Sequence, residues 1–158
     1  MLLDRYQKPI YNVALQMVNN IDDAADLTQT VFIKAYEKLN SYNDRYKFYS
    51  WLYRIAVNTS LNFVEKNKRQ ELLGDRDVLQ GSLVEDELES LERVEKLQEA
   101  ILELRPEYRI VIVLRHFHDL SYDEMGTILD IPEKTVKSRL FAARQMLKDL
   151  LLKSGLME

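Results

Sequence analysis

One segment constrains the fold of this chain more than any other: LSYDEMGTILDIPEKTVKSRLFAAR, residues 120–144. Ser121 followed by Glu124 is a capping-box pattern, which predicts the start of a helix. The apolar residues that follow share one helical face: Met125, Ile128 and Leu129. Pro132 then interrupts the pattern, because proline disfavours helical geometry at the residue before it and suits the first turn of a new helix. The segment predicts two short helices joined by a tight turn.

The second of these helices is basic. From residue 134 to residue 148 its charged side chains are all cationic: Lys134, Lys137, Arg139, Arg144 and Lys148. Its other side carries an apolar row: Val136, Leu140, Ala143 and Leu147. A helix, a short turn and a basic helix form a helix-turn-helix, whose second helix fits the major groove of duplex DNA. The simpler alternative is a solvated cationic helix, but small polar residues lie between the cations, where a helix approaches a phosphate backbone: Thr135 and Ser138.

The composition predicts an all-α protein. The 158 residues include only 4 glycines and 3 prolines, and strand-type alternation is scarce. The absence of cysteine excludes disulfides and cysteine-ligated zinc. No apolar stretch is long enough to span a bilayer, and charges come too early for a signal peptide. We therefore expect a cytoplasmic protein with no membrane insertion.

The charge is unevenly distributed. The net charge of −4 divides into +3 over residues 1–69, −7 over residues 70–95 and 0 over residues 96–158. The acidity is thus confined to a middle segment, and both flanks are free to present basic faces. We expect a helical domain at 1–69, an acidic linker at 70–95 and a second helical domain at 96–158. A helix is expected to begin in the second half of the linker, from about Glu85.

Three helices are expected in the first domain, at about 3–19, 21–39 and 49–68, with Pro9 as a candidate break. The third begins with an aromatic cluster, and Arg54, Asn58 and Asn62 then recur every four residues on one face. Aromatic rings, amides and cations together suit single-stranded nucleic acid. The alternatives are that the aromatic residues form core, which is favoured for Trp51 and Tyr53, and that the asparagines belong to a solvated face.

Nothing in the sequence predicts an enzyme. The only histidines are His116 and His118, two residues apart and without a carboxylate cluster, so a structural role is favoured over a catalytic or metal site. We expect no enzymatic activity, no metal and no cofactor.

Three strings in order resemble the bacterial RNA polymerase sigma factors of the small extracytoplasmic-function (ECF) type. They are DLTQTVFIKAYEKL at 26–39, FYSWLYRIAVNTSLNF at 48–63 and LRPEYRIVIVLRHFHDLSYDEMGTILDIPEKTVKSRLFAAR at 104–144. The resemblance implies a promoter-specificity subunit that initiates transcription. It also implies an all-α fold of two small domains: a sigma-two helical bundle that meets the minus-ten element and a sigma-four helix-turn-helix domain that meets the minus-thirty-five element.

The resemblance and the patterns above together assign three sets of candidate residues. The first contacts core RNA polymerase: Asp26, Gln29 and Thr30, the last standing where the family usually has Glu. The second contacts the melted minus-ten strand, with the loop at 41–48 capturing a flipped-out base: Tyr46, Phe48, Trp51, Arg54, Asn58 and Asn62. The third contacts the duplex minus-thirty-five element: Arg115, Lys134, Thr135, Lys137, Ser138, Arg139, Phe141 and Arg144.

Within the third set, Lys137 and Ser138 are expected at base edges, and Arg115 and Arg144 at phosphates. For Arg139 the alternative is an ion pair inside the motif, with Asp123 or Glu124. Two positions depart from the family: Lys134 replaces a common Gly, and Ala142 stands where many members carry Arg.

A further departure lies at the N-terminus, where family members usually have twenty to thirty more residues that form a first helix. Either the start is misplaced, the chain is trimmed, or the domain does without that helix; if it is absent, we expect apolar surface to be uncovered on the remaining helices. The expected partners are core RNA polymerase, promoter DNA and an anti-sigma factor. The alternative function is an autonomous helix-turn-helix regulator that binds duplex DNA without the polymerase.

Overall fold

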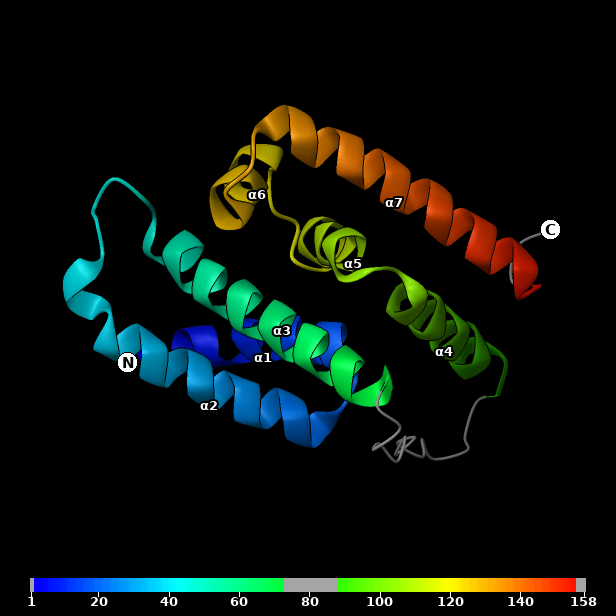
Figure 1. Ribbon diagram of the computed structural model, residues 1–158, viewed down its shortest axis with the longest axis horizontal. Coiled ribbons are helices and arrows are strands. Elements are labelled where there is room, and N and C mark those ends of the chain that lie inside the picture. Colours follow the sequence, from blue (N-terminus) through cyan, green and yellow to red (C-terminus); the bar gives the residue numbers. More distant parts are fainter. Residues whose placement is uncertain (1, 73–87, 156–158) are drawn as a thin grey trace.

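The computed structural model describes residues 2–72 and 88–155 of the chain. Every regular element in these ranges is helical, which confirms the predicted all-α fold (Figure 1). The N-terminal module, as we call residues 2–72, contains α1 (Leu2–Val18), α2 (Ile21–Glu37), the 3-10 turn η1 (Leu39–Ser41) and α3 (Phe48–Leu72). The C-terminal module, residues 88–155, contains α4 (Leu88–Glu103), α5 (Pro106–Ile112), the π-helical turn η2 (Val113–Phe117), α6 (Tyr122–Leu129) and α7 (Glu133–Lys153).

The helix boundaries follow local signals, with small differences from expectation. Asn20 caps α2, its side-chain oxygen accepting the Asp23 N–H at 2.9 Å, as the predicted start after Asn20 requires. The second helix ends at Glu37 rather than at residue 39, because the chain tightens into η1. The third is longer than predicted and reaches Leu72. Residues 73–87 of the predicted linker, including the expected helix start at Glu85, lie outside the described residues.

Pro9 does not break the first helix. It lies inside α1, where it removes one backbone hydrogen bond. The helix continues because the face that follows is fully buried against the rest of the fold: Ile10, Val13 and Met17 are each 0% exposed. Burial of these side chains outweighs the lost bond.

The helix-turn-helix forms as the sequence predicts. The side chains of Ser121 and Glu124 each bond the other residue's backbone N–H at 3.1 Å, which completes the capping box of α6. Asp130 ends α6 in the left-handed conformation (φ 57°), which Asp tolerates better than most residues. A Cβ at Gly126 would lie 3.0 Å from the Ile131 carbonyl oxygen, so this position of α6 favours glycine.

The two modules are packed on each other. Helices α1–α3 form one layer, and α5–α7 lie over it with α7 on the far side (Figure 1). One continuous apolar cluster includes buried residues of both layers, among them Ile10, Val13 and Ile55 from the N-terminal module and Leu104, Ile110 and Met125 from the C-terminal module. We call the contact between the modules the seam. In the seam α1 packs against α5, and α3 packs against α6.

Apolar side chains stay exposed on the outer face of α2. Ile21, Ile33 and Tyr36 are 70%, 59% and 82% exposed. Exposed apolar side chains of this kind suit contact with a partner. Among the described residues no helix combines the length and the apolar character needed to cross a membrane.

Candidate nucleic-acid interface

The predicted polar row on α3 is exposed. Arg54, Asn58 and Asn62 all face solvent, whereas Leu52, Ala56 and Val57 on the opposite side are at most 1% exposed. A 25-residue helix whose inner face is buried holds these three side chains in line, one turn apart. The row therefore presents one guanidinium and two amides along a rigid element.

Aromatic side chains gather where the loop at 41–47 enters α3. The Trp51 ring lies 5.4 Å from the Tyr42 ring and 5.6 Å from the Phe48 ring, centroid to centroid. Phe48 and Trp51 are half-buried and pack on the core, so the expected core role and an exposed edge coexist. Tyr42 was missed by the sequence reasoning. Its hydroxyl donates to the Tyr46 carbonyl at 2.6 Å and shapes the loop.

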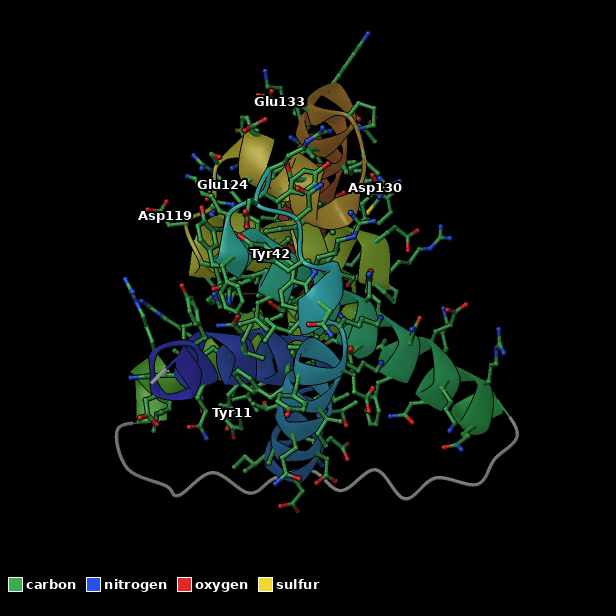
Figure 2. The ribbon with its side chains drawn as sticks, turned by 90° about the vertical axis from the view of Figure 1, so that its left-hand side faces the viewer. Tyr11, Tyr42, Asp119, Glu124, Asp130 and Glu133 are labelled. Atoms are coloured by element: carbon green, nitrogen blue, oxygen red, sulfur yellow. The ribbon has the colours of Figure 1, made fainter. Side chains whose placement is uncertain are left out.

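A cleft of about 270 Å³ separates this region from the helix-turn-helix. Tyr46 and Arg54 line one side, and the α6–α7 corner lines the other with Asp123, Gly126, Thr127, Asp130, Ile131 and Glu133. Arg54 Nη2 reaches across to Asp130 Oδ2 at 3.5 Å, with side chains 46% and 80% exposed. Figure 2 shows Asp130 and Glu133 at this corner, above the loop that carries Tyr42.

The recognition helix α7 presents its predicted residues to solvent. Lys134, Lys137, Ser138 and Arg144 are exposed, Phe141 is 67% exposed, and Thr135 and Arg139 are half-buried. The buried side of the same helix is Val136, Leu140 and Ala143, as the apolar row predicts. The helix itself lies on the side of the C-terminal module away from α1–α3 (Figure 1).

Two of the predicted duplex-contact residues, one expected at a phosphate and one at a base edge, are held in place by neighbours. Arg115 stacks over the Tyr122 ring at 5.0 Å and donates from Nη1 to the Leu120 carbonyl at 2.9 Å. Lys137 Nζ lies 5.7 Å from the same ring and 3.9 Å from Glu133 Oε1. Both cations thus contact the same ring, that of Tyr122 on α6.

Arg144 is also oriented by a neighbour. Its Nε donates to His116 Nε2 at 3.1 Å. Burial, followed by the charges of Arg144 and Arg115, lowers the pKa of His116 below its ordinary value. The alternative for Arg139 is not found, since within the described ranges it forms no ion pair with Asp123 or Glu124.

The predicted polymerase-contact residues lie on α2. Asp26, Gln29 and Thr30 are exposed and follow one another along one side of the helix. The Thr30 hydroxyl donates to the Asp26 carbonyl at 3.0 Å, so its side chain is folded back on the helix. Ile33 continues the same surface one turn further on.

The sequence favoured a structural role for His118. In the structure its ring contacts residues of two other helices, which the spacing of the sequence did not reveal. The Tyr53 hydroxyl of α3 lies 3.0 Å from Nδ1, and Gln16 Oε1 of α1 lies 2.8 Å from Nε2. Because the Gln16 oxygen only accepts, the ring donates from Nε2 and accepts at Nδ1. Burial lowers the pKa of His118 to about 4, so the ring is neutral at physiological pH.

Arg109 was also missed. It is 7% exposed and its Nη1 donates to the Met17 carbonyl at the end of α1, at 2.7 Å. Its Nη2 donates to the Leu102 and Leu104 carbonyls at 2.7 and 3.0 Å. The guanidinium thus binds orphan carbonyls at the C-terminal ends of α1 and α4, where helix dipoles favour a cation. No spacing pattern marks such a residue. In the described part of the chain no three acidic or histidine side chains are grouped to hold a metal ion.

One helical module carries an exposed row of side chains suited to single-stranded DNA, and the second contains a helix-turn-helix. Together they define a two-module DNA-binding protein. Comparison with known proteins specifies the class further. Residues 2–70 match the Sigma-70 region 2 family and residues 94–147 match the Sigma-70, region 4 family. The chain is 37% identical over 159 residues to the ECF RNA polymerase sigma factor SigW of Bacillus subtilis, covering 93% of this chain and 85% of that protein. It is likewise 37% identical over 157 residues to the ECF RNA polymerase sigma-E factor of Escherichia coli K12, covering 92% and 82%.

Two solved structures have the same fold. One is the sigma factor RpoE in complex with the anti-sigma factor NepR from Bartonella quintana, with a TM-score of 0.76, 25% identity, and coverage of 94% of this chain and 93% of that chain. The other is CnrH in complex with the cytosolic domain of CnrY, with a TM-score of 0.70, 23% identity, and coverage of 95% and 84%. The chain belongs to the ECF sigma factors of RNA polymerase, which are regulatory subunits, and this confirms the resemblance seen in the sequence.

Proposed function

We propose that this sigma factor binds core RNA polymerase, directs it to promoters and holds the melted minus-ten strand and the duplex minus-thirty-five element on separate modules. The observation that carries the proposal is the ordered pair of exposed faces: the Arg54, Asn58 and Asn62 row on α3, and the cationic side of α7. The modules correspond to domains at 1–69 and 96–158, with the acidic linker at 70–95 between them.

The α3 row acts on unpaired DNA. Unpairing and flipping a base costs a few kcal/mol, which a fitted pocket and stacking offset. Trp51 and Phe48 supply aromatic edges, and Tyr46 lies in the loop that receives the flipped base. A stacked base contributes roughly 1–3 kcal/mol. The asparagine amides bond base edges, and the Arg54 guanidinium holds phosphate.

The α7 face acts on paired DNA. A helix of 21 residues is about 32 Å long, enough to cross a major groove and reach both phosphate walls. Arg115 and Arg144 bind phosphates and supply salt-dependent affinity, with Lys134 and Arg139 as additional cations. Lys137, Ser138 and Phe141 lie at base edges and supply sequence preference, with Thr135 beside them.

The partners follow from these roles. Asp26, Gln29 and Thr30 on α2 contact the polymerase, and Ile33 adds apolar area to that surface. An anti-sigma factor is proposed as a further partner, since the structural relative from Bartonella quintana is a sigma factor bound to an anti-sigma factor. We place the action of the chain in the cytoplasm, where promoter DNA is transcribed. The sigma factor itself catalyses no bond change.

Run-off transcription with core polymerase of Bacillus subtilis and a randomised promoter library tests the proposal. The expected result is transcription that depends on the chain and selects two sequence elements. A chain that pulls down no core enzyme, yet binds duplex operators tightly by itself, contradicts it and supports the autonomous helix-turn-helix regulator instead.

A further inference from the structure

A hydrogen bond joins the π-helical turn η2 to the recognition helix. Arg144 Nε of α7 donates to His116 Nε2 of η2 at 3.1 Å, across 28 residues of sequence. Both side chains are exposed, and Arg115, the residue before His116, is half-buried. Turns of the π type are rare and often lie at functional sites. His116 therefore lies beside both arginines to which the proposed function assigns phosphate contacts.

The direction of this hydrogen bond fixes the protonation state of the imidazole ring. A guanidinium has donors and no acceptor, so His116 Nε2 must carry a lone pair. The ring is therefore neutral, with its single N–H on Nδ1. A proton bound at Nε2 removes this acceptor and releases the Arg144 guanidinium.

Two positive charges keep the ring neutral in the free chain. Partial burial lowers the pKa of His116, and the charges of Arg144 and Arg115 lower it further. One of these cations comes from α7 and the other from η2 itself. An anion that neutralises them makes the charged ring favourable.

The other charged groups around η2 are directed elsewhere. Helices α1, α5 and α6 pack on this turn. Helix α1 carries no charged side chain between residues 9 and 18. The charged side chains of α5 and α6 have their own surroundings: Glu107 pairs with Arg105, Arg109 donates to the Met17 carbonyl, Asp123 lines the cleft beside Arg54, and Glu124 accepts from the Ser121 N–H. The arginines on either side of His116 are therefore the charges that set its proton affinity.

A DNA phosphate is the anion that reverses this balance. A negative charge within about 4–6 Å of an imidazole favours the protonated ring. The proton comes from bulk water and binds His116 Nε2, and the hydrogen bond from Arg144 Nε is the one that breaks. Both groups then point a charged N–H donor at phosphate oxygens, which accept strong hydrogen bonds from such donors.

We propose that His116 is a further duplex contact, which binds phosphate together with Arg115 and Arg144. In the free chain its neutral ring holds Arg144 in place. On the duplex the ring takes up one proton and donates to a phosphate oxygen. The inference deepens the proposed function of the α7 side and rests on it.

The affinity of the full chain for a DNA duplex of arbitrary sequence tests the inference, because phosphate contacts carry no base sequence. Fluorescence anisotropy measures this affinity at pH 8 and pH 6 and at several salt concentrations. The affinity is expected to rise roughly threefold from pH 8 to pH 6, since binding takes up a proton in the range where histidine titrates. The slope of log affinity against log salt is expected to steepen by up to about 0.9, the value for one additional phosphate contact.

The variant His116→Gln keeps an acceptor for Arg144 but does not titrate. Its duplex affinity at pH 8 is expected to match that of the unmodified chain, and the rise in affinity at pH 6 is expected to disappear. A merely structural role of His116 predicts a different result, with affinity lowered equally at both pH values and the rise retained.

The matched control His118→Gln makes the same chemical change at the other histidine. Burial lowers the pKa of His118 to about 4, so this ring is neutral at both pH values. The control is expected to keep the rise in affinity. Proton NMR of the ring Hε1 atoms follows each histidine directly, and the two variants assign the two signals. The pKa of His116 is expected to be higher with the duplex than without it.

An equal rise in affinity for the unmodified chain and for His116→Gln overturns the inference, as does a pKa of His116 that the duplex leaves unchanged. A chain that binds no duplex at either pH overturns both the inference and the duplex part of the proposed function. A chain that binds the duplex without taking up a proton overturns the inference alone.

Discussion

The two DNA-facing surfaces of this sigma factor are built from similar side chains but differ in availability. Lys134, Lys137 and Arg144 on α7 are exposed to solvent, and α7 lies on the side of the C-terminal module away from α1–α3 (Figure 1). The row on α3 begins at the seam, where Arg54 already has an anionic partner in Asp130. The sequence places a polar face on each helix, but the α3 face meets a side chain of the other module, whereas Lys137 and Arg144 on α7 contact neighbours within their own module.

The difference shows that exposure of a helix face depends on what the neighbouring module presents to it. The C-terminal module carries exposed cations on α7, and its acidic side chains at the α6–α7 corner line the cleft beside Arg54. One helix-turn-helix therefore presents a basic surface for duplex DNA and an acidic corner against α3. Separating the modules should make the α3 row as accessible as the cationic side of α7. A substitution on one face alone should change only the DNA contact made by that face.

The largest effect is expected at the buried end of the seam. Arg109→Met leaves three carbonyl groups without their donor, and it should lower the free energy of unfolding by about 3 kcal/mol. Urea denaturation measures this change. The control Arg105→Met removes an exposed guanidinium that pairs with Glu107 and should cost less than about 0.5 kcal/mol. Equal losses in the free energy of unfolding from the two variants would show that the Arg109 hydrogen bonds do not stabilise the fold.

Acid should loosen the middle of the seam. The pKa of His118 is about 4 in the packed state, against about 6.5 for a hydrated histidine. The packed state favours the neutral ring, so its stability is complete above pH 6.5 and declines as the pH falls toward 4. The ratio of separated to packed modules should rise about twentyfold between pH 7 and pH 5.

Energy transfer between one dye at Glu37→Cys on α2 and a second at Asp149→Cys on α7, measured across this pH range, follows the change. The groups in hydrogen-bonding contact with the ring are the Tyr53 hydroxyl of α3 and the Gln16 amide of α1, and both are uncharged between pH 5 and pH 7. His118→Gln should remove the response. A response that survives this substitution would assign the titration to another group.

On the α3 face, Asn58→Ala should reduce promoter opening roughly tenfold, because an amide contact to an unpaired base is lost. Permanganate reactivity of the melted strand measures opening, and gel shift with a duplex minus-thirty-five element measures binding by the C-terminal module. Only the first should change. Asn67→Ala, on the same helix but off the row, serves as the control. Equal losses in both assays would make Asn58 a structural residue.

The smallest effect is expected on the solvent-facing surface. Arg115→Ala should weaken duplex binding uniformly across sequences and reduce the slope of log affinity against log salt by roughly 1. Titrations at several salt concentrations on two unrelated duplexes measure this. Ser138→Ala is the counterpart, since loss of a base-edge contact should depend on sequence and leave the slope unchanged. A sequence-selective loss from Arg115→Ala would exclude the phosphate role.

Local patterns in the sequence predicted the elements well, because each pattern acts over a few residues. The capping box at Ser121, the turn before Pro132 and the buried side of α7 all appear where the pattern predicts. Pro9 shows where local rules fail, since burial of the following face keeps α1 continuous through a residue that disfavours helix. Arg109 and His118 could not be predicted, because their partners are 92, 65 and 102 residues away.

By itself the sequence determined the family, the all-helical class, the helix-turn-helix and the side chains available on each face. Periodicity, caps and turns are short-range, and they are readable without knowing where distant helices lie. Only the tertiary structure decided that the modules pack on each other, that Arg54 meets Asp130 and that His118 is buried between α1 and α3. The physical reason is that burial and pairing between modules depend on the summed packing of many distant side chains, which no local spacing encodes.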